Sequence, residues 1–208
     1  MNYSELVAAA KAYADNSDIE VANNIDMFIL LTEARINRLL KTREQSTRAF
    51  VITVADRAYY ALPPDYSGMR DVQLNSDVPS ADHSISQFHY LNPEQMNVKS
   101  QAESTDLLFY TVIGSDLQIH PTQDDGLSIE LVYYQRVPNL NGSDTTNWCS
   151  LKHPDIYLAG MTGEISLFNK DYEIADGWFD RLGSAIDELD NADIKERWAG
   201  QPMVTRAG

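Results

Sequence analysis

The stretch NWCSLKHPDIYLAGMTGEISLFNKDYEIADGWFDRLGSAIDEL, residues 147–189, contains two consecutive segments with helical periodicity. Apolar residues recur every three or four positions in each segment, which is typical of a helix with one buried face. The first set is Leu158, Met161, Ile165 and Phe168, and the second is Ala175, Trp178, Phe179, Leu182, Ile186 and Leu189. Because a short polar sequence, Asn169-Lys170-Asp171, separates the two sets, we predict an antiparallel helical hairpin.

Two more helices are predicted near the N-terminus, over residues 3–14 and about 20–42. Ser4 can cap the first, although the capping box after it is incomplete. The second carries an apolar stripe from Ile25 to Leu40. Four cations crowd its last turns, where they complement the negative end of the helix dipole or contact an acidic partner: Arg35, Arg38, Lys41 and Arg43.

The sequence between these helical regions has the composition of β-strands. Residues 47–54 are mainly β-branched or aromatic, and residues 59–62 follow them after a short polar turn, which predicts a β-hairpin. A strand over 69–74, a polar loop over 75–84 and a short helix capped by Asn92 come next. Residues 107–137 are expected to form a meander, whose last strand has apolar residues on both faces and is therefore predicted to be covered on both sides.

These predicted elements indicate an α+β fold. A single helix pair buries too little surface to be stable alone, so we expect the N- and C-terminal pairs to pack together. Residues 1–45 and 147–198 would then form a helical bundle domain. Residues 46–146 would form an inserted antiparallel β-sandwich or small barrel, and residues 199–208 a flexible C-terminal arm.

The composition excludes several classes of protein. The chain has 208 residues, of which 43% are hydrophobic, too many for a disordered protein. It has no apolar run long enough for a membrane span, so we expect no membrane partner. It has a single cysteine, so we expect a protein made in a reducing cytoplasm. The net charge is −15, and residues 93–208 hold eight Lys and Arg against nineteen Asp and Glu. Such acidity argues against tight nucleic-acid binding, and it serves either solubility or the repulsion of DNA.

No motif points to catalysis. The histidines, His83, His89, His120 and His153, lack the spacing of a compact zinc site, and Asp124-Asp125-Gly126 lacks the other ligands of a calcium loop. Cys149 has no evident base beside it, since His153 follows across a predicted helix start. The carboxylates Asp187, Glu188, Asp190 and Asp193 are assigned to a solvated helix face. We therefore predict no catalytic residue, no metal and no cofactor, and keep an acidic hydrolase only as an alternative.

Several short segments together resemble the head-to-tail adaptor proteins, also called connector or head-completion proteins, of short-tailed bacteriophages. They occur in the expected order and cover most of the chain: Tyr3 to Leu6, Phe28 to Leu40, Ala61 to Tyr66, Tyr133 to Leu140, Asn147-Trp148 and His153 to Leu158.

The resemblance implies a structural, non-enzymatic virion protein. Such adaptors form a ring, usually of twelve subunits, in the neck of the virion between the portal protein and the tail nozzle or tail-fibre proteins. DNA passes through the channel without sequence-specific contact. On this basis the candidate channel lining is Asp176, Asp180, Asp187 and Glu188, and the candidate portal-binding arm is Trp198, Gln201, Pro202, Met203, Val204 and Arg206. The alternative is another virion component, a tail-tube or fibre-attachment protein that docks through the β-domain.

Overall fold

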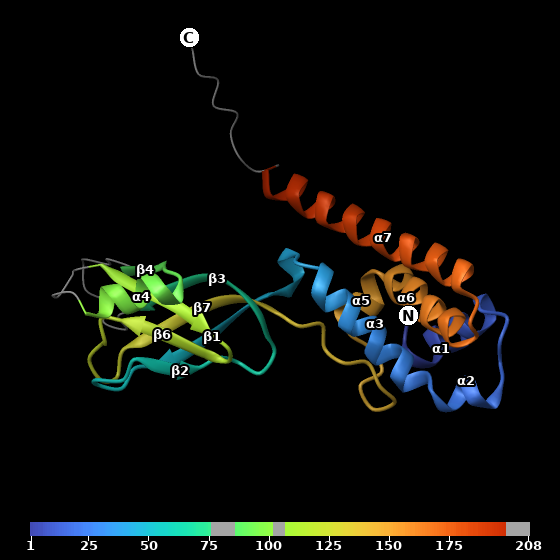
Figure 1. Ribbon diagram of the computed structural model, residues 1–208, viewed down its shortest axis with the longest axis horizontal. Helices are drawn as coiled ribbons and strands as arrows, with labels where there is room; N and C mark the ends of the chain where they lie inside the picture. The colour runs from blue at the N-terminus through green and yellow to red at the C-terminus, as the bar shows by residue number, and fades with distance from the viewer. Residues whose placement is uncertain (76–85, 102–106, 199–208) are drawn as a thin grey trace, which may run out of the picture. The chain divides into compact units, whose positions relative to one another are not determined.

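A computed structural model gives the fold of residues 1–75, 86–101 and 107–198 (Figure 1). The chain divides into two compact units. The helical unit combines Met1–Glu44 with the chain from Val137 onward, and the β-unit is Gln45–Arg136. The predicted α+β fold class, with a sheet inserted in a helical protein, is confirmed.

The helical unit is built around one central helix, α6 (Pro154–Phe168), in which every residue from Ala159 to Ser166 is buried. It contacts α1 (Tyr3–Tyr13), α3 (Ile25–Leu39), α5 (Trp148–Lys152) and α7 (Tyr172–Trp198). The core therefore joins apolar residues from both ends of the chain, among them Leu6, Phe28, Ile36, Tyr157, Met161, Ile165 and Leu182.

The α6–α7 hairpin is confirmed, with the polar sequence at residues 169–171 as its turn. Lys170 completes that turn with φ +66, a left-handed conformation that favours glycine. The predicted helix over 20–42 is instead two helices, α2 (Ile19–Asn23) and α3, because the chain leaves helical geometry at Asn24. The first cap also differs from the prediction, since Asn2 and Glu5 form a complete capping box on α1.

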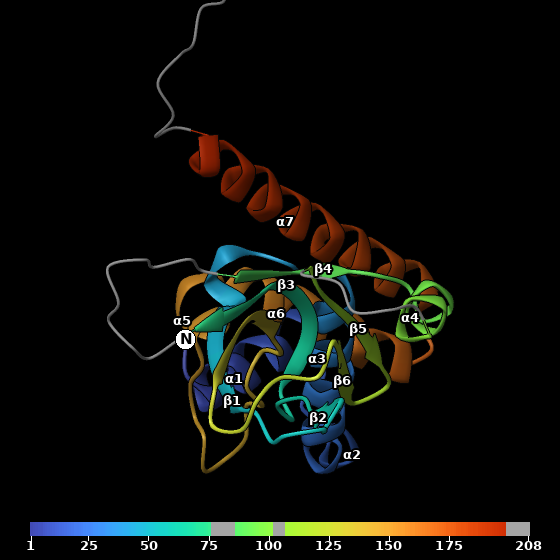
Figure 2. The same cartoon turned by 90° about the vertical axis from the view of Figure 1, so that its left-hand side faces the viewer.

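The β-unit contains one mixed sheet of seven strands, which curls around its own core in Figure 2. The strand order is β1-β7-β3-β4-β5-β6-β2, and only β4 and β5 are parallel. The strands are β1 (Ser46–Ile52), β2 (Tyr59–Ala61), β3 (Tyr66–Asn75), β4 (Ser86–Tyr90), β5 (Leu108–Ile113), β6 (Asp116–His120) and β7 (Ser128–Gln135). A short helix, α4 (Pro93–Ser100), begins at the predicted Asn92 cap.

Two predicted strand pairings are wrong. β1 pairs with β7 and β2 pairs with β6, so residues 47–62 are not a hairpin. The Val54 N–H, just after β1, instead donates a hydrogen bond to the Tyr60 hydroxyl at 3.1 Å. The meander is also interrupted, because β7 lies between β1 and β3 and not beside β6. Only one face of β7 is buried, since Glu130, Val132 and Tyr134 on its other face are partly exposed.

Candidate functional site

Four of the segments that carry the family resemblance meet around one buried carboxylate, Glu33 of α3. Its side chain is only 2% exposed. One carboxylate oxygen accepts hydrogen bonds from the Leu140 N–H at 2.6 Å and from the Tyr157 hydroxyl at 3.0 Å. Burial raises the pKa of Glu33 above its ordinary value of 4.5, although both hydrogen bonds act in the opposite direction.

Further hydrogen bonds hold the groups around Glu33 in place. The Asn147 side-chain amide donates to the Tyr157 hydroxyl at 2.7 Å and to the Pro138 carbonyl at 2.6 Å. The Asn37 side chain accepts from the Val137 N–H at 2.8 Å. These bonds fasten the segment that begins at Val137 to both α3 and α6, so the network holds the two sequence halves of the helical unit together.

Glu33 was not singled out from the sequence. Its position four residues after Ile29 and three before Ile36 places a carboxylate on the apolar stripe of α3, which is the signal that identifies it. A buried carboxylate without hydrogen bonds is very unfavourable, so a charged residue on such a stripe predicts donors nearby. Which donors these are depends on residues more than a hundred positions away.

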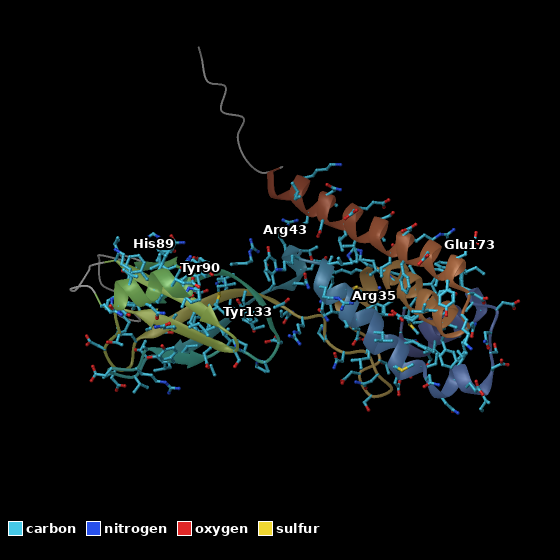
Figure 3. All side chains as sticks on the ribbon, viewed as in Figure 1. Arg35, Arg43, His89, Tyr90, Tyr133 and Glu173 are labelled. Atoms are coloured by element: carbon cyan, nitrogen blue, oxygen red, sulfur yellow. The ribbon has the colours of Figure 1, made fainter. Side chains whose placement is uncertain are left out.

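Two of the four cations near the end of α3, Arg35 and Arg43, form ion pairs within the helical unit; both are labelled in Figure 3. The Arg35 guanidinium lies 2.6 Å from the buried Glu164 carboxylate and 4.0 Å from the Phe179 ring centre. The Arg43 guanidinium lies 2.6 Å from Asp193. The assignment of Asp193 to a solvated face is therefore wrong, because this carboxylate is buried against Arg43.

The outward face of α7 carries the carboxylates that were predicted to line a channel. Asp176, Asp180, Asp187 and Glu188 are all exposed. The first three are four and seven residues apart, so they lie on one side of the helix, and Glu173 extends the same row toward the helix start. The structure thus brings these residues together as one acidic surface, and their role in a channel stays a prediction.

The structure describes only the first residue of the candidate portal-binding arm. Trp198 is the last residue of α7, and nothing is described of its side chain. Gln201, Pro202, Met203, Val204 and Arg206 lie outside the described residues.

The residues considered for catalysis, Cys149 and His153, lie in the packed part of the helical unit. Cys149 is fully buried, and desolvation raises its pKa to about 12, which keeps the thiol protonated. His153 lies at the junction of α5 and α6, 3.6 Å from a Glu44 carboxylate oxygen. Across residues 1–75, 86–101 and 107–198, no group of His, Cys, Asp and Glu has the geometry to hold a metal ion.

A further segment of the resemblance, Ala61 to Tyr66, meets the segment Tyr133 to Leu140 inside the β-unit. The Tyr133 hydroxyl donates to the Asp65 carboxylate at 2.9 Å, and the Tyr66 and Tyr133 rings lie 5.9 Å apart. The Arg136 N–H donates to the Asp65 carbonyl at 2.7 Å. The segment Ala61 to Tyr66 therefore contacts the C-terminal end of β7 and helps to fix the register of β7 beside β3.

Comparison with protein-family models gives a match over almost the whole chain. The family model of the SU10 adaptor protein matches residues 1–206. No match was found among curated proteins. No helix in the described part of the chain is long and apolar enough to cross a membrane. The chain therefore belongs to the SU10 adaptor protein family, a family of structural phage adaptors that is not known as an enzyme family.

Proposed function

We propose that this protein forms a ring, of twelve copies, that joins the portal to the tail in the neck of a short-tailed phage. The observation that carries the proposal is the family match over residues 1–206, which covers both units and both sequence halves of the helical unit. The protein would be made in the host cytoplasm and would join the virion during assembly.

The contacts within the helical unit suit this structural role. The buried hydrogen bond between Tyr157 and Glu33 and the partly buried ion pair between Arg35 and Glu164 connect the two sequence segments that form the unit. A subunit that carries a tail needs such fixed geometry more than it needs a cleft.

The acidic face of α7 is proposed to line the DNA channel. Asp176, Asp180 and Asp187 are exposed in a row, with Glu188 beside them. A ring would multiply these charges around its axis. Carboxylates repel DNA phosphates, so the DNA would pass without binding to the wall.

The C-terminal residues are proposed to bind the portal. Deleting residues 200–208 should weaken binding to the portal ring while the truncated protein keeps its fold, since α7 ends at Trp198. Portal binding at wild-type strength by the folded, truncated protein would contradict this role for the arm.

Electron microscopy of the purified protein mixed with portal tests the whole proposal. The adaptor role requires a ring stacked on the narrow end of the portal, with the acidic face toward the axis. A protein found only on tail tubes or fibres would favour the alternative, a virion component that docks through its β-unit. Phe50 and Ile52, exposed on the outer strand β1, are the first residues to substitute in that case.

A further inference from the structure

Two turns of the helical unit meet at one end, which we call the tip. One is the connection between α1 and α2, and the other is the turn between α6 and α7. The Asn16 side-chain amide donates to the Asn169 side-chain oxygen at 2.9 Å. The Tyr13 and Trp178 rings meet edge to face at 5.6 Å. These contacts fix the two turns side by side.

Large apolar side chains are concentrated on this tip. Six of them are between 37% and 75% exposed: Tyr13, Ile19, Leu167, Phe168, Tyr172 and Ile174. Single exposed apolar residues are common, but a cluster from two adjoining turns is a feature of interaction surfaces. We call these six residues the tip patch.

The tip patch has an acidic rim. Residues 12–20 and 167–174 contain five exposed carboxylates and one cation, Lys170. The carboxylates are Asp15, Asp18, Glu20, Asp171 and Glu173, and Glu173 projects from the first turn of α7 (Figure 3). A surface that binds here should therefore present apolar side chains together with Lys or Arg.

The outward side of α3 has that composition. The other sides of this helix contact Phe179 of α7, the core and Leu140. Its fourth side exposes Met27, Leu30, Leu31 and Ala34, with Leu30 59% exposed, and carries the exposed cation Arg38. Lys41, also exposed, follows just after the helix ends at Leu39. We call these six residues the α3 face. The exposed carboxylate Asp26, four residues before Leu30, borders this face and accepts a hydrogen bond from the Tyr3 hydroxyl. Arg38 and Lys41 make no ion pair with a described residue.

Arg38 lies too far along α3 to pair with the tip of its own subunit. The Phe28 and Phe168 rings, 5.5 Å apart, place the first turn of α3 near the tip. Arg38 follows ten residues later, about 15 Å along the helix axis. Acidic and basic charges are thus separated along each subunit.

We propose that the tip patch of one copy packs on the α3 face of the next copy. Apolar residues would meet apolar residues, and the acidic rim would surround Arg38 and Lys41. The two surfaces are different, so the contact is head to tail, and such contacts generate rings when the rotation closes. The inference deepens the proposed function, because it names the subunit contact of the proposed ring.

Charge exchange tests this contact in the full-length protein. The face-reversed variant is Arg38→Glu with Lys41→Glu. The tip-reversed variant is Asp18→Lys with Asp171→Lys and Glu173→Lys, which leaves two carboxylates against four lysines on the rim. Each alone places like charges at every contact, so we expect self-association to weaken at least tenfold or so in sedimentation velocity. An equimolar mixture restores opposite charges at every contact, and so does one chain carrying all five substitutions. Both should associate like the wild type.

A matched control separates the contact from net charge. Asp124 and Asp125 are exposed in a turn of the β-unit, so Asp124→Lys with Asp125→Lys makes a charge change of the same sign as the tip-reversed variant, away from both surfaces. This control should associate as well as or better than the wild type. Circular dichroism and thermal melting verify that every variant is folded.

The outcomes distinguish the contact from the adaptor role. Unchanged association of either reversed variant, or failure of the mixture to recover, overturns the contact. The same samples are then applied to portal and imaged. Wild-type rings on the portal with equally good rings from both variants refute the contact but leave the adaptor role intact. Recovery of association in solution without any ring on the portal supports the contact but refutes the adaptor role. The absence of self-association both in solution and on the portal refutes the contact and the adaptor role.

Discussion

At the scale of single residues, Glu33 makes the stability of the helical unit depend on pH. Its raised pKa means that the folded chain keeps the carboxyl proton to a higher pH than the unfolded chain does. The stabilisation linked to this proton is fully present below about pH 4.5, the unfolded pKa, and is lost as the pH rises through the folded pKa. Glu33 therefore stabilises the fold as a hydrogen-bond acceptor, while its charge reduces that stabilisation at neutral pH.

Substitution of Glu33 separates these two effects. Glu33→Ala leaves the Leu140 N–H and the Tyr157 hydroxyl without their acceptor, and should lower the free energy of unfolding by about 2–3 kcal/mol. Glu33→Gln keeps an acceptor and removes the charge, so its stability relative to the wild type should improve from pH 4 to pH 8. Urea unfolding at both pH values measures this, with the exposed Glu20→Gln as control. A Glu33→Gln difference that does not change with pH would contradict the assignment.

The exposure of a single residue could be predicted from the sequence where it depends only on the periodicity of its own helix. The helical stripe of residues 175–189 predicted that Asp176, Asp180, Asp187 and Glu188 face solvent, and they do. Asp193 continues the same helix, but Arg43, 150 residues earlier, buries it. Helical periodicity cannot show a partner at that separation in sequence.

At the scale of elements, two glycines explain how α6 occupies the centre of the helical unit. A Cβ atom on Gly160 would lie 2.4 Å from a methyl carbon of Thr32 on α3, and one on Gly163 would lie 2.7 Å from the Phe179 ring on α7. Thr32 is itself fully buried. The two neighbouring helices can therefore approach α6 closely only because these positions lack side chains.

Gly160→Ala should consequently destabilise the protein although alanine favours helices. Overpacking against Thr32 costs about 1–3 kcal/mol and exceeds the gain in helix propensity of about 1 kcal/mol. Gly183→Ala on α7 is the matched control, because nothing lies within 4 Å of its added methyl group. It should stabilise the protein by up to about 1 kcal/mol. Chemical unfolding of both variants checks the opposite signs, and stabilisation by Gly160→Ala would show that α3 and α6 are packed less tightly.

The elements differ in how well the sequence predicted them. The α6–α7 hairpin was predictable because its periodicity and its turn are contained in one continuous stretch. The strand pairs β1–β7, β2–β6 and β4–β5 were not, because each joins segments separated by other elements. Strand composition identifies a strand but carries little information about its neighbour. Gly160 and Gly163 were missed for the same reason, since their contacts lie on other helices.

At the scale of the whole molecule, the distribution of charge links the fold to the proposed function. The chain carries a net charge of −15, yet Arg35 and Arg43 are used within the helical unit, and Arg38 and Lys41 are assigned to the contact between copies. The row on α7 formed by Glu173, Asp176, Asp180 and Asp187 contains no cation. A surface without paired cations keeps its full repulsion toward phosphate.

This row leads to a graded prediction for phage that carry variant adaptors. The neutral set replaces Asp176, Asp180 and Asp187 with Asn and Glu188 with Gln, and the reversed set replaces all four with Lys. The reversed set would bind phosphates, and it should slow DNA ejection by at least about tenfold at low salt, with partial recovery at high salt. The neutral set should fall between this and the wild type, because it removes repulsion without adding attraction.

Ejection is measured on purified particles as the rate at which packaged DNA becomes accessible to nuclease. Particle counts and DNA content, taken first, exclude defects in assembly. The variant with Asp124→Lys and Asp125→Lys adds lysines elsewhere, and it should eject DNA at the wild-type rate if the effect belongs to α7. Equal rates for the wild type, the neutral set and the reversed set would mean that α7 faces away from the DNA. The α7 surface would then be free to bind another virion protein, and the ring would need a different channel wall.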